Sequence, residues 1–73
     1  KKHVRLRDLR EDRDLTQEQI AELLGTTKQY YQKYEAGLRP LLVRWLEILA
    51  DFYETSTDYL LGRTAIKKPY PKN

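Results

Sequence analysis

Side chains that form hydrogen bonds with bases and phosphates are concentrated in one short segment, at Lys28, Gln29, Gln32 and Lys33. The amide of glutamine matches the donor and acceptor pair of adenine, and the ammonium of lysine matches guanine or a phosphate. In a helix, positions three or four residues apart share a face, so we expect these four side chains on one side. The segment therefore predicts a surface that binds a polyanion with accessible base edges.

The other side of the same segment carries tyrosines. Tyr31 and Tyr34 are three residues apart and are expected to be buried, which leaves Tyr30 exposed. Exposed tyrosines can also stack on bases, as in proteins that bind single strands. The helical spacing favours the core for Tyr31 and Tyr34.

Two short helices joined by a tight turn position this surface. Thr16 and Gln19 have the spacing of a capping box at the start of a helix over residues 17–24. Gly25 is expected to end that helix with a positive φ, since glycine has no Cβ to clash. A second helix over Lys28–Glu35 follows at once, which is the helix-turn-helix pattern.

Three further helices are predicted around this pair. Lys2–Asp12 is amphipathic, with a thin apolar seam. Leu41–Glu54 is apolar over most of its circumference, which is typical of a central helix or of one with a second face in an interface. Ser56 caps a last short helix, which Gly62 ends. The predicted fold class is all-α, a compact bundle of about five short helices with a helix-turn-helix.

The chain divides into one domain and a tail. Residues 1–63 contain all of the predicted helices, and residues 64–73 contain lysines and prolines without an apolar pattern. We therefore expect a basic, flexible C-terminal tail. Its lysines are interpreted as solvated, with contact to phosphate as the alternative.

The composition limits the class of protein. The 73 residues include 14 Lys and Arg against 11 Asp and Glu, a formal net charge of +3, and no cysteine. A chain of this size holds one modest core, and the absence of thiols fits a cytoplasmic location. We expect no membrane partner, since no apolar run approaches the roughly 18 residues of a membrane span.

The sequence also lacks the residue sets of common enzymes. The single histidine, His3, stands near the first residue, and no acid, base and nucleophile occur together. The glycines all fall at predicted helix ends, so no glycine-rich loop is available for a phosphate. We expect no catalysis, no cofactor and no metal site.

The run LTQEQIAELLGTTKQYYQKYEAGLRP, which begins at Leu15, resembles the Cro/C1-type helix-turn-helix family of phage repressors and bacterial XRE-like regulators. The segments LRDLRED before it and LADFYETSTDYLLGR after it also fit, so the resemblance covers residues 4–63. It implies a lambda-repressor-like fold and a cytoplasmic, bacterial or phage-encoded regulator, most simply a repressor. Its function would be sequence-specific binding of an operator in double-stranded DNA, with helix 27–35 in the major groove.

The resemblance also implies roles for single residues. Gln17 would bind a phosphate or a base edge, and Arg39 would bind a phosphate. Arg10 and Glu35 would form a partly buried ion pair between the first and third helices, with an ordinary surface pair as the alternative. The remaining DNA-binding candidates, at the start of the second helix of the motif or on it, are Thr27, Lys28, Gln29, Tyr30, Gln32 and Lys33.

Two residues depart from the family pattern. Thr26 stands where an aliphatic residue is commoner. Tyr31 stands where isoleucine is usual, so either the packing there is roomier or the tyrosine hydroxyl reaches the surface. Trp45 is interpreted as a core residue, with an interface as the alternative.

Two questions about partners stay open at the level of sequence. The same fold serves as a protein-binding module, for example in antitoxin-like chains, but such a surface would carry apolar or acidic residues in place of Lys28 and Lys33. A homodimer on two half-sites is also expected, because one short helix contacts few base pairs. The surfaces nominated for it are the apolar side of Leu41–Glu54 and the segment Tyr59–Leu61.

Overall fold

The computed structural model describes residues 4–40 and 42–68. They form five helices, and the all-α prediction is confirmed. The helices are α1 (Val4–Asp12), α2 (Gln17–Leu24), α3 (Lys28–Glu35), α4 (Val43–Phe52) and α5 (Thr57–Leu61). Among the described residues, no helix is long and apolar enough to cross a membrane.

The predicted helix ends are confirmed at most positions. Thr16 and Gln19 form the capping box at the start of α2, and Gly25 ends that helix with φ 74°. Thr27 accepts a hydrogen bond from the Tyr30 amide at the start of α3, and Ser56 caps α5 in the same way. Each cap satisfies an amide that the helix itself leaves without a partner.

The predicted helix Leu41–Glu54 was too long. α4 begins after Leu42, which is extended, and no side chain caps its start. It ends at Phe52, because Glu54 takes a φ of 56°, a left-handed conformation that a helix cannot include. Leu41 lies outside the described residues, as do the first two residues of the predicted helix Lys2–Asp12.

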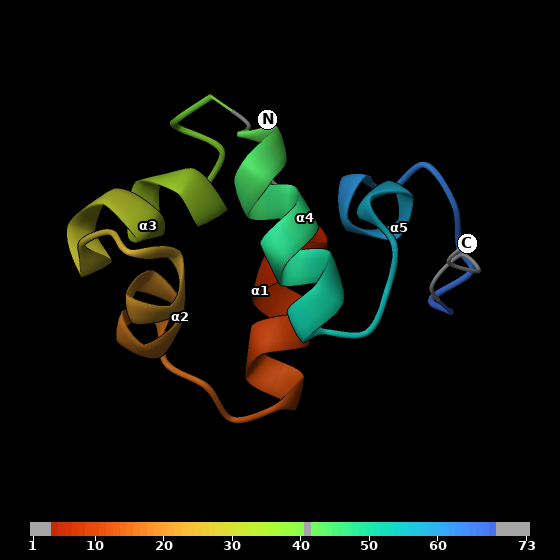
Figure 1. Cartoon of the computed structure of the whole chain (residues 1–73), viewed down its shortest axis with the longest axis horizontal. Coiled ribbons are helices and arrows are strands. Elements are labelled where there is room, and N and C mark those ends of the chain that lie inside the picture. Colours follow the sequence, from red (N-terminus) through yellow and green to blue (C-terminus); the bar gives the residue numbers. More distant parts are fainter. Residues whose placement is uncertain (1–3, 41, 69–73) are drawn as a thin grey trace.

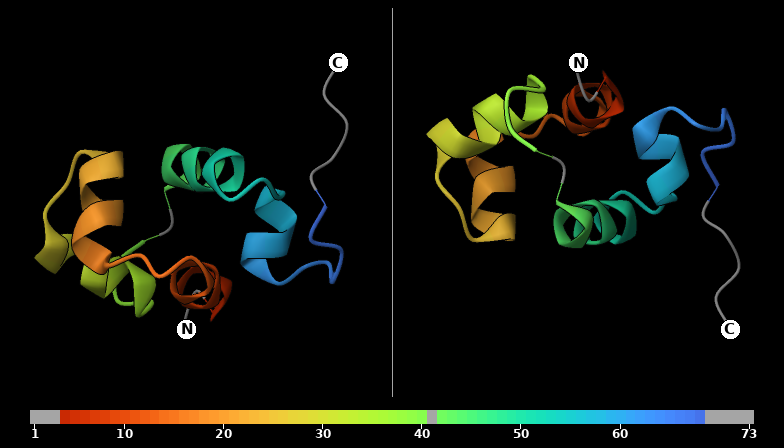
Figure 2. Two further views of the ribbon diagram at one scale, coloured as in Figure 1. Left: turned by 90° about the horizontal axis from the view of Figure 1, so that it is seen from below. Right: turned by 90° about the horizontal axis from the view of Figure 1, so that it is seen from above.

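The helices enclose a central core. α4 lies in front of α1 in Figure 1, with the α2–α3 pair on one side and α5 on the other. In the two views of Figure 2 the helices surround the core: α1 and α4 face each other, and the α2–α3 pair and α5 close the two ends. α3 and α5 therefore lie at opposite ends of the domain.

Aromatic side chains make up much of the core. Tyr31, Tyr34 and Tyr53 are buried together with apolar residues from α1, α2, α4 and α5. These are Leu6, Leu9, Ile20, Ala21, Leu46, Leu49, Ala50 and Leu60. The expectation that Tyr31 and Tyr34 are core residues is confirmed, and Trp45 packs against this cluster while only partly buried.

The position of Tyr31 decides between the two alternatives left by the sequence. Its side chain is 0% exposed, so its hydroxyl does not reach the surface. The ring and its hydroxyl are buried in the core. Burial raises the pKa of this tyrosine, and the carboxylate of Glu35 adds to the effect. The tyrosine side chain is therefore accommodated inside the core.

Two arginines tie distant helix ends to α1 and to the turn after it. Arg5 donates to the Tyr59 carbonyl at 3.0 Å and to the Thr64 carbonyl at 2.8 Å. Arg13 donates to the Phe52 and Tyr53 carbonyls at 3.2 and 3.3 Å. The carbonyls at a helix C-terminus carry partial negative charge and lack helical partners, so cations stabilise them.

The segment after α5 makes contacts with the domain as far as the structure describes it. Arg5 binds the Thr64 carbonyl, and the Thr55 hydroxyl donates to the Lys67 carbonyl. The division of the chain at residue 63 stays a prediction, and residues 69–73 of the predicted tail lie outside the described residues.

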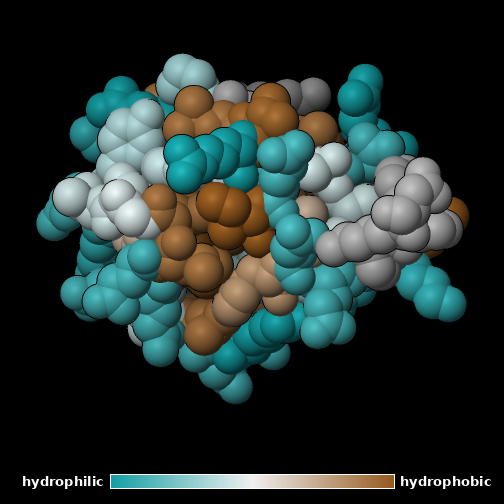
Figure 3. All heavy atoms as spheres, in the orientation of Figure 1, coloured by the Kyte–Doolittle hydropathy of each residue, from teal (hydrophilic) through white to brown (hydrophobic). Residues whose placement is uncertain are grey.

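Hydrophobic side chains also reach the surface. Figure 3 shows them gathered on the face that carries α4, with hydrophilic side chains around them. Leu38 and Val43, in and after the loop that leads to α4, are 70% and 68% exposed, and Leu42 is 39% exposed.

Candidate nucleic-acid interface

α3 has one buried face and one open face. Its buried face consists of Tyr31, Tyr34 and Glu35. The open face carries side chains that donate hydrogen bonds, and all of them are exposed: Lys28, Gln29, Gln32 and Lys33. Because the one carboxylate of the helix is buried, the exposed side chains of α3 include cations and no anion. The helix therefore presents a polar, positively charged surface.

Two of the other predicted site residues lie at the start of this helix. Thr27 is exposed, and its hydroxyl accepts a hydrogen bond from the Tyr30 amide at 3.1 Å. The hydroxyl proton is left to donate to a ligand. Tyr30 was expected to be exposed, but it is half-buried, because its ring packs against Trp45 of α4 with the centroids 5.6 Å apart.

Arg10 and Glu35 form a two-point ion pair. Nε of Arg10 lies 2.9 Å from Oε2 of Glu35, and Nη2 lies 3.0 Å from Oε1. The two side chains are 12% and 4% exposed. The hydrogen bonds with Glu35 raise the pKa of Arg10 and outweigh its burial. This planar, two-point geometry is the one that arginine and carboxylate favour.

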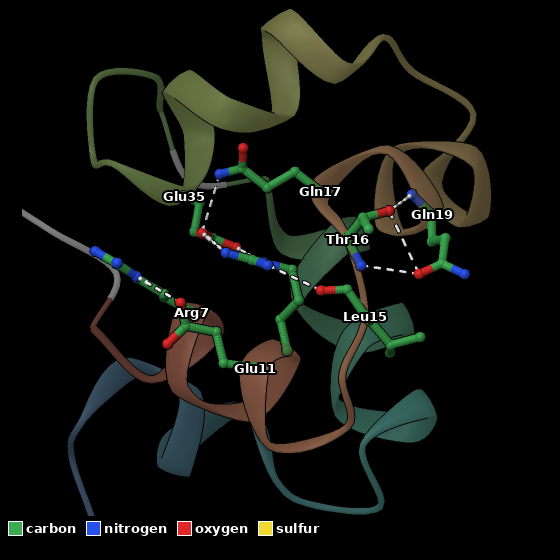
Figure 4. A network of polar contacts seen from close by, with 8 residues as sticks. Arg7, Glu11, Leu15, Thr16, Gln17, Gln19 and Glu35 are labelled. Atoms are coloured by element: carbon green, nitrogen blue, oxygen red, sulfur yellow. Dashed lines mark hydrogen bonds and ion pairs between the residues drawn. The ribbon is translucent and has the colours of Figure 1, made fainter.

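The same ion pair holds the start of α2. Nη1 of Arg10 donates to the Leu15 carbonyl at 2.9 Å, which fixes the turn before Thr16. Nε2 of Gln17 donates to Oε1 of Glu35 at 3.2 Å. Figure 4 shows the amide nitrogen of Gln17 directed toward Glu35 and its oxygen directed away. Gln17, predicted to bind DNA, therefore has one donor already engaged within the protein.

A polar hollow lies between α1, the start of α2 and the end of α3. Gln17 and Gln32 contribute to its wall together with the ion pair of Arg10 and Glu35. Arg7, Asp8, Glu11 and Ala36 complete it. The structure thus places Gln17 and Gln32, which are far apart in sequence, at one concave surface.

Arg39 lies in the loop that leads from α3 to α4, and it is not part of the polar hollow. It is exposed, and its guanidinium carbon lies 5.5 Å from the centroid of the Tyr30 ring. Trp45, which supports that ring, was not identified as a site residue. No local pattern points to it, because the contact joins two helices that are separated by a loop.

No other chemistry stands out at this surface. Within residues 4–40 and 42–68, no group of three or more His, Cys, Asp or Glu is placed to hold a metal ion. The arrangement offers amide and ammonium groups on an exposed helix, flanked by a guanidinium. Such groups bind phosphates and base edges.

The chain is similar to known proteins over most of its length. It is 46% identical over 68 residues to the uncharacterized HTH-type transcriptional regulator YobD of Bacillus subtilis (strain 168), which covers 93% of this chain and 59% of that protein. It is 38% identical over 68 residues, with the same coverage, to the HTH-type transcriptional regulator AnsR of that organism. The cryptic phage CTXphi transcriptional repressor RstR of Vibrio cholerae is 43% identical over 49 residues, 67% of this chain and 44% of the repressor. No solved structure matches the chain.

The chain thus spans less than two thirds of the length of the relatives YobD and AnsR. A family model described as a helix-turn-helix domain matches residues 4–61, which include all five helices. This match confirms the resemblance found in the sequence. The chain belongs to the helix-turn-helix domain family.

Proposed function

We propose that this chain is the DNA-binding domain of a transcriptional regulator, most simply a repressor, and that it binds double-stranded DNA sequence-specifically. The observation that carries the proposal is the open face of α3, where every exposed side chain is Lys or Gln and the half-buried Tyr30 lies at the edge. A helix of this kind fits the major groove of B-DNA. The names of the relatives, which include transcriptional regulators and a repressor, support the same function.

Direct base contacts would come from the middle of the open face. The Gln29 amide can bind N6 and N7 of adenine with two hydrogen bonds, and the Lys33 ammonium can bind guanine or a phosphate. Thr27 precedes both of them at the N-cap of α3, and Gln32 lies between them in the sequence. These contacts would distinguish one sequence from another.

Phosphate contacts would come from the edges of the same surface. Lys28 at the start of α3 and Arg39 beyond its end are both exposed cations. Gln17 uses one N–H group for Glu35, and its second N–H group is available for a phosphate because an amide nitrogen carries two donors. These contacts would fix the orientation of the domain without distinguishing sequences.

The experiment that tests this function is selection of bound duplexes from a random pool with the purified chain. We expect repeated rounds to enrich one short sequence, most simply a palindrome. Failure to retain any duplex at low salt would contradict DNA binding and favour the second candidate.

The second candidate is a protein-binding module of the antitoxin-like kind, which uses the same fold. Its binding surface would be expected to carry apolar or acidic residues on α3. The exposed cations Lys28 and Lys33 and the burial of Glu35 favour DNA. We therefore place the DNA-binding role first. We also propose that the chain acts in the cytoplasm and is not an enzyme, as expected from the sequence.

We also propose that the chain binds its site as a homodimer. The exposed apolar residues Leu42 and Val43 of the α4 region and Leu61 of α5 lie on the surfaces nominated for the contact. Two copies on half-sites about 34 Å apart would double the number of base contacts. Sedimentation of the chain with a saturating palindromic duplex is expected to show two protomers per duplex, and a single protomer at saturation would contradict the dimer.

A further inference from the structure

Three aromatic rings connect the core to the edge of the proposed DNA-binding surface. The buried ring of Tyr34 contacts Trp45 edge-on, with the centroids 4.9 Å apart. Trp45 in turn contacts Tyr30 edge-on, at 5.6 Å and with an angle of 85° between the ring planes. Edge-to-face contacts of this kind are favourable beyond the area that they bury, so the core fixes the orientation of the Tyr30 ring.

The free face of the Tyr30 ring carries a cation. The guanidinium carbon of Arg39 lies over it, 5.5 Å from the centroid. A cation within about 6 Å of a ring centroid is attracted by the negative face of the ring. Arg39 comes from an exposed loop, and its long side chain would otherwise sample many rotamers. The ring therefore restricts where the guanidinium lies.

We propose that Tyr30 is a positioning residue, whose ring, supported by Trp45, holds the guanidinium of Arg39 beside α3 for a phosphate of duplex DNA. This rests on the proposed DNA-binding function and replaces the expectation that Tyr30 itself contacts DNA. The half-burial of Tyr30 against α4 separates it from the open face of Gln29 and Lys33.

The test compares Tyr30→Leu, which removes the ring, with Tyr30→Phe, which keeps it. Binding to the selected duplex and to a scrambled duplex of the same composition is titrated at several salt concentrations. Loss of an exposed cation–π contact corresponds to about a two- to fivefold loss of affinity. We expect Tyr30→Leu to lose that factor equally on both duplexes and Tyr30→Phe to keep wild-type affinity.

The dependence on Arg39 is tested in a double-mutant cycle. Arg39→Ala is expected to weaken binding to both duplexes and to reduce the log–log salt slope by about one unit. Adding Tyr30→Leu to that variant is expected to change nothing further, because the ring then has no cation to hold. The proposal would be overturned if Tyr30→Leu lost affinity for the selected duplex alone. It would also be overturned if Tyr30→Leu lost as much affinity in the Arg39→Ala variant as in the wild type.

A matched control is available at the opposite end of the domain. The guanidinium of Arg5 lies 4.1 Å from the Tyr59 ring centroid, in a contact of the same kind. Tyr59 belongs to α5, which Figure 1 shows away from α3. Arg5→Ala, which removes the cation of that contact and keeps the Tyr59 ring, is therefore expected to leave DNA affinity unchanged, and a loss equal to that of Tyr30→Leu would show that the Tyr30 effect is general destabilisation.

A measurement on the free protein separates this inference from the proposed function. The ring current of Tyr30 should shift the NMR signals of the Arg39 side-chain protons upfield in the wild-type chain. The shift should vanish in Tyr30→Leu and remain in Tyr30→Phe. Wild-type signals at the positions of an unstructured arginine would overturn the proposal even if DNA binds and even if Tyr30→Leu fails to fold. Failure of the wild-type chain to bind any duplex would instead overturn the proposed function.

Discussion

Arg10→Ala is expected to lower the free energy of unfolding by about 3–5 kcal/mol, because it leaves the carboxylate of Glu35 buried without its cation. Glu35 is 4% exposed at its side chain and accepts two hydrogen bonds from Arg10. The substitution also removes the bond to the Leu15 carbonyl that fixes the turn before α2. A loss of this size is a large share of the stability of a small domain.

Arg7→Ala is the matched control for this prediction. Arg7 pairs with Glu11 at 3.1 Å, but the two side chains are 66% and 52% exposed. Exposed pairs contribute about 0–1 kcal/mol, so Arg7→Ala should unfold almost as the wild type does. Urea denaturation of the three proteins measures the difference. A loss below about 1 kcal/mol for Arg10→Ala would show that the Arg10–Glu35 pair is as minor as a surface pair.

Alkaline pH is expected to unfold the domain between pH 10 and pH 12. Burial raises the pKa of Tyr34 to about 12 and that of Tyr53 to about 12, and it raises the pKa of Tyr31 as well. Above the ordinary tyrosine pKa of about 10, the unfolded chain releases these protons while the folded chain keeps them. Stability is therefore complete below pH 10 and falls above it by up to about 1.4 kcal/mol per pH unit for each tyrosine.

Tyr53→Phe tests the cause of this alkaline unfolding. The Tyr53 hydroxyl is buried and has no hydrogen-bond partner among the described residues, so its removal should cost little near neutral pH. It also removes one of the groups that ionise on unfolding, so the variant should lose stability less steeply above pH 10. Denaturation followed by circular dichroism at a series of pH values measures both slopes. If the wild type and Tyr53→Phe lost stability equally steeply above pH 10, the loss would come from groups other than Tyr53.

Local sequence signals predicted the parts of the fold that depend on neighbouring residues. The Thr16–Gln19 capping box and the left-handed Gly25 are decided within one turn of chain, and both are confirmed. The end of α4 was missed because Glu54 adopts φ 56° without being a glycine. Asp14 does the same at φ 54° in the turn before α2. Side-chain type alone does not reveal such positions.

In the candidate site, too, features within one helix were predicted and contacts between helices were not. The open face of α3 followed from helical spacing, since it needs only the period of one helix. The contacts that hold its edges join distant segments, such as Gln17 with Glu35 and Tyr30 with Trp45. Their geometry depends on how α2, α3 and α4 pack, which the spacing of residues in one helix does not determine.

The central claim is that Gln29 contacts a base from α3 in the major groove. The most direct measurement is the affinity of the wild type and of Gln29→Ala for the selected duplex and for a scrambled duplex at one salt concentration. Gln29→Ala is expected to cost about 1–3 kcal/mol of binding free energy on the selected duplex and much less on the scrambled one, and to relax the preference at one base position. An equal loss on both duplexes, or no loss on either, would contradict the proposed placement of α3.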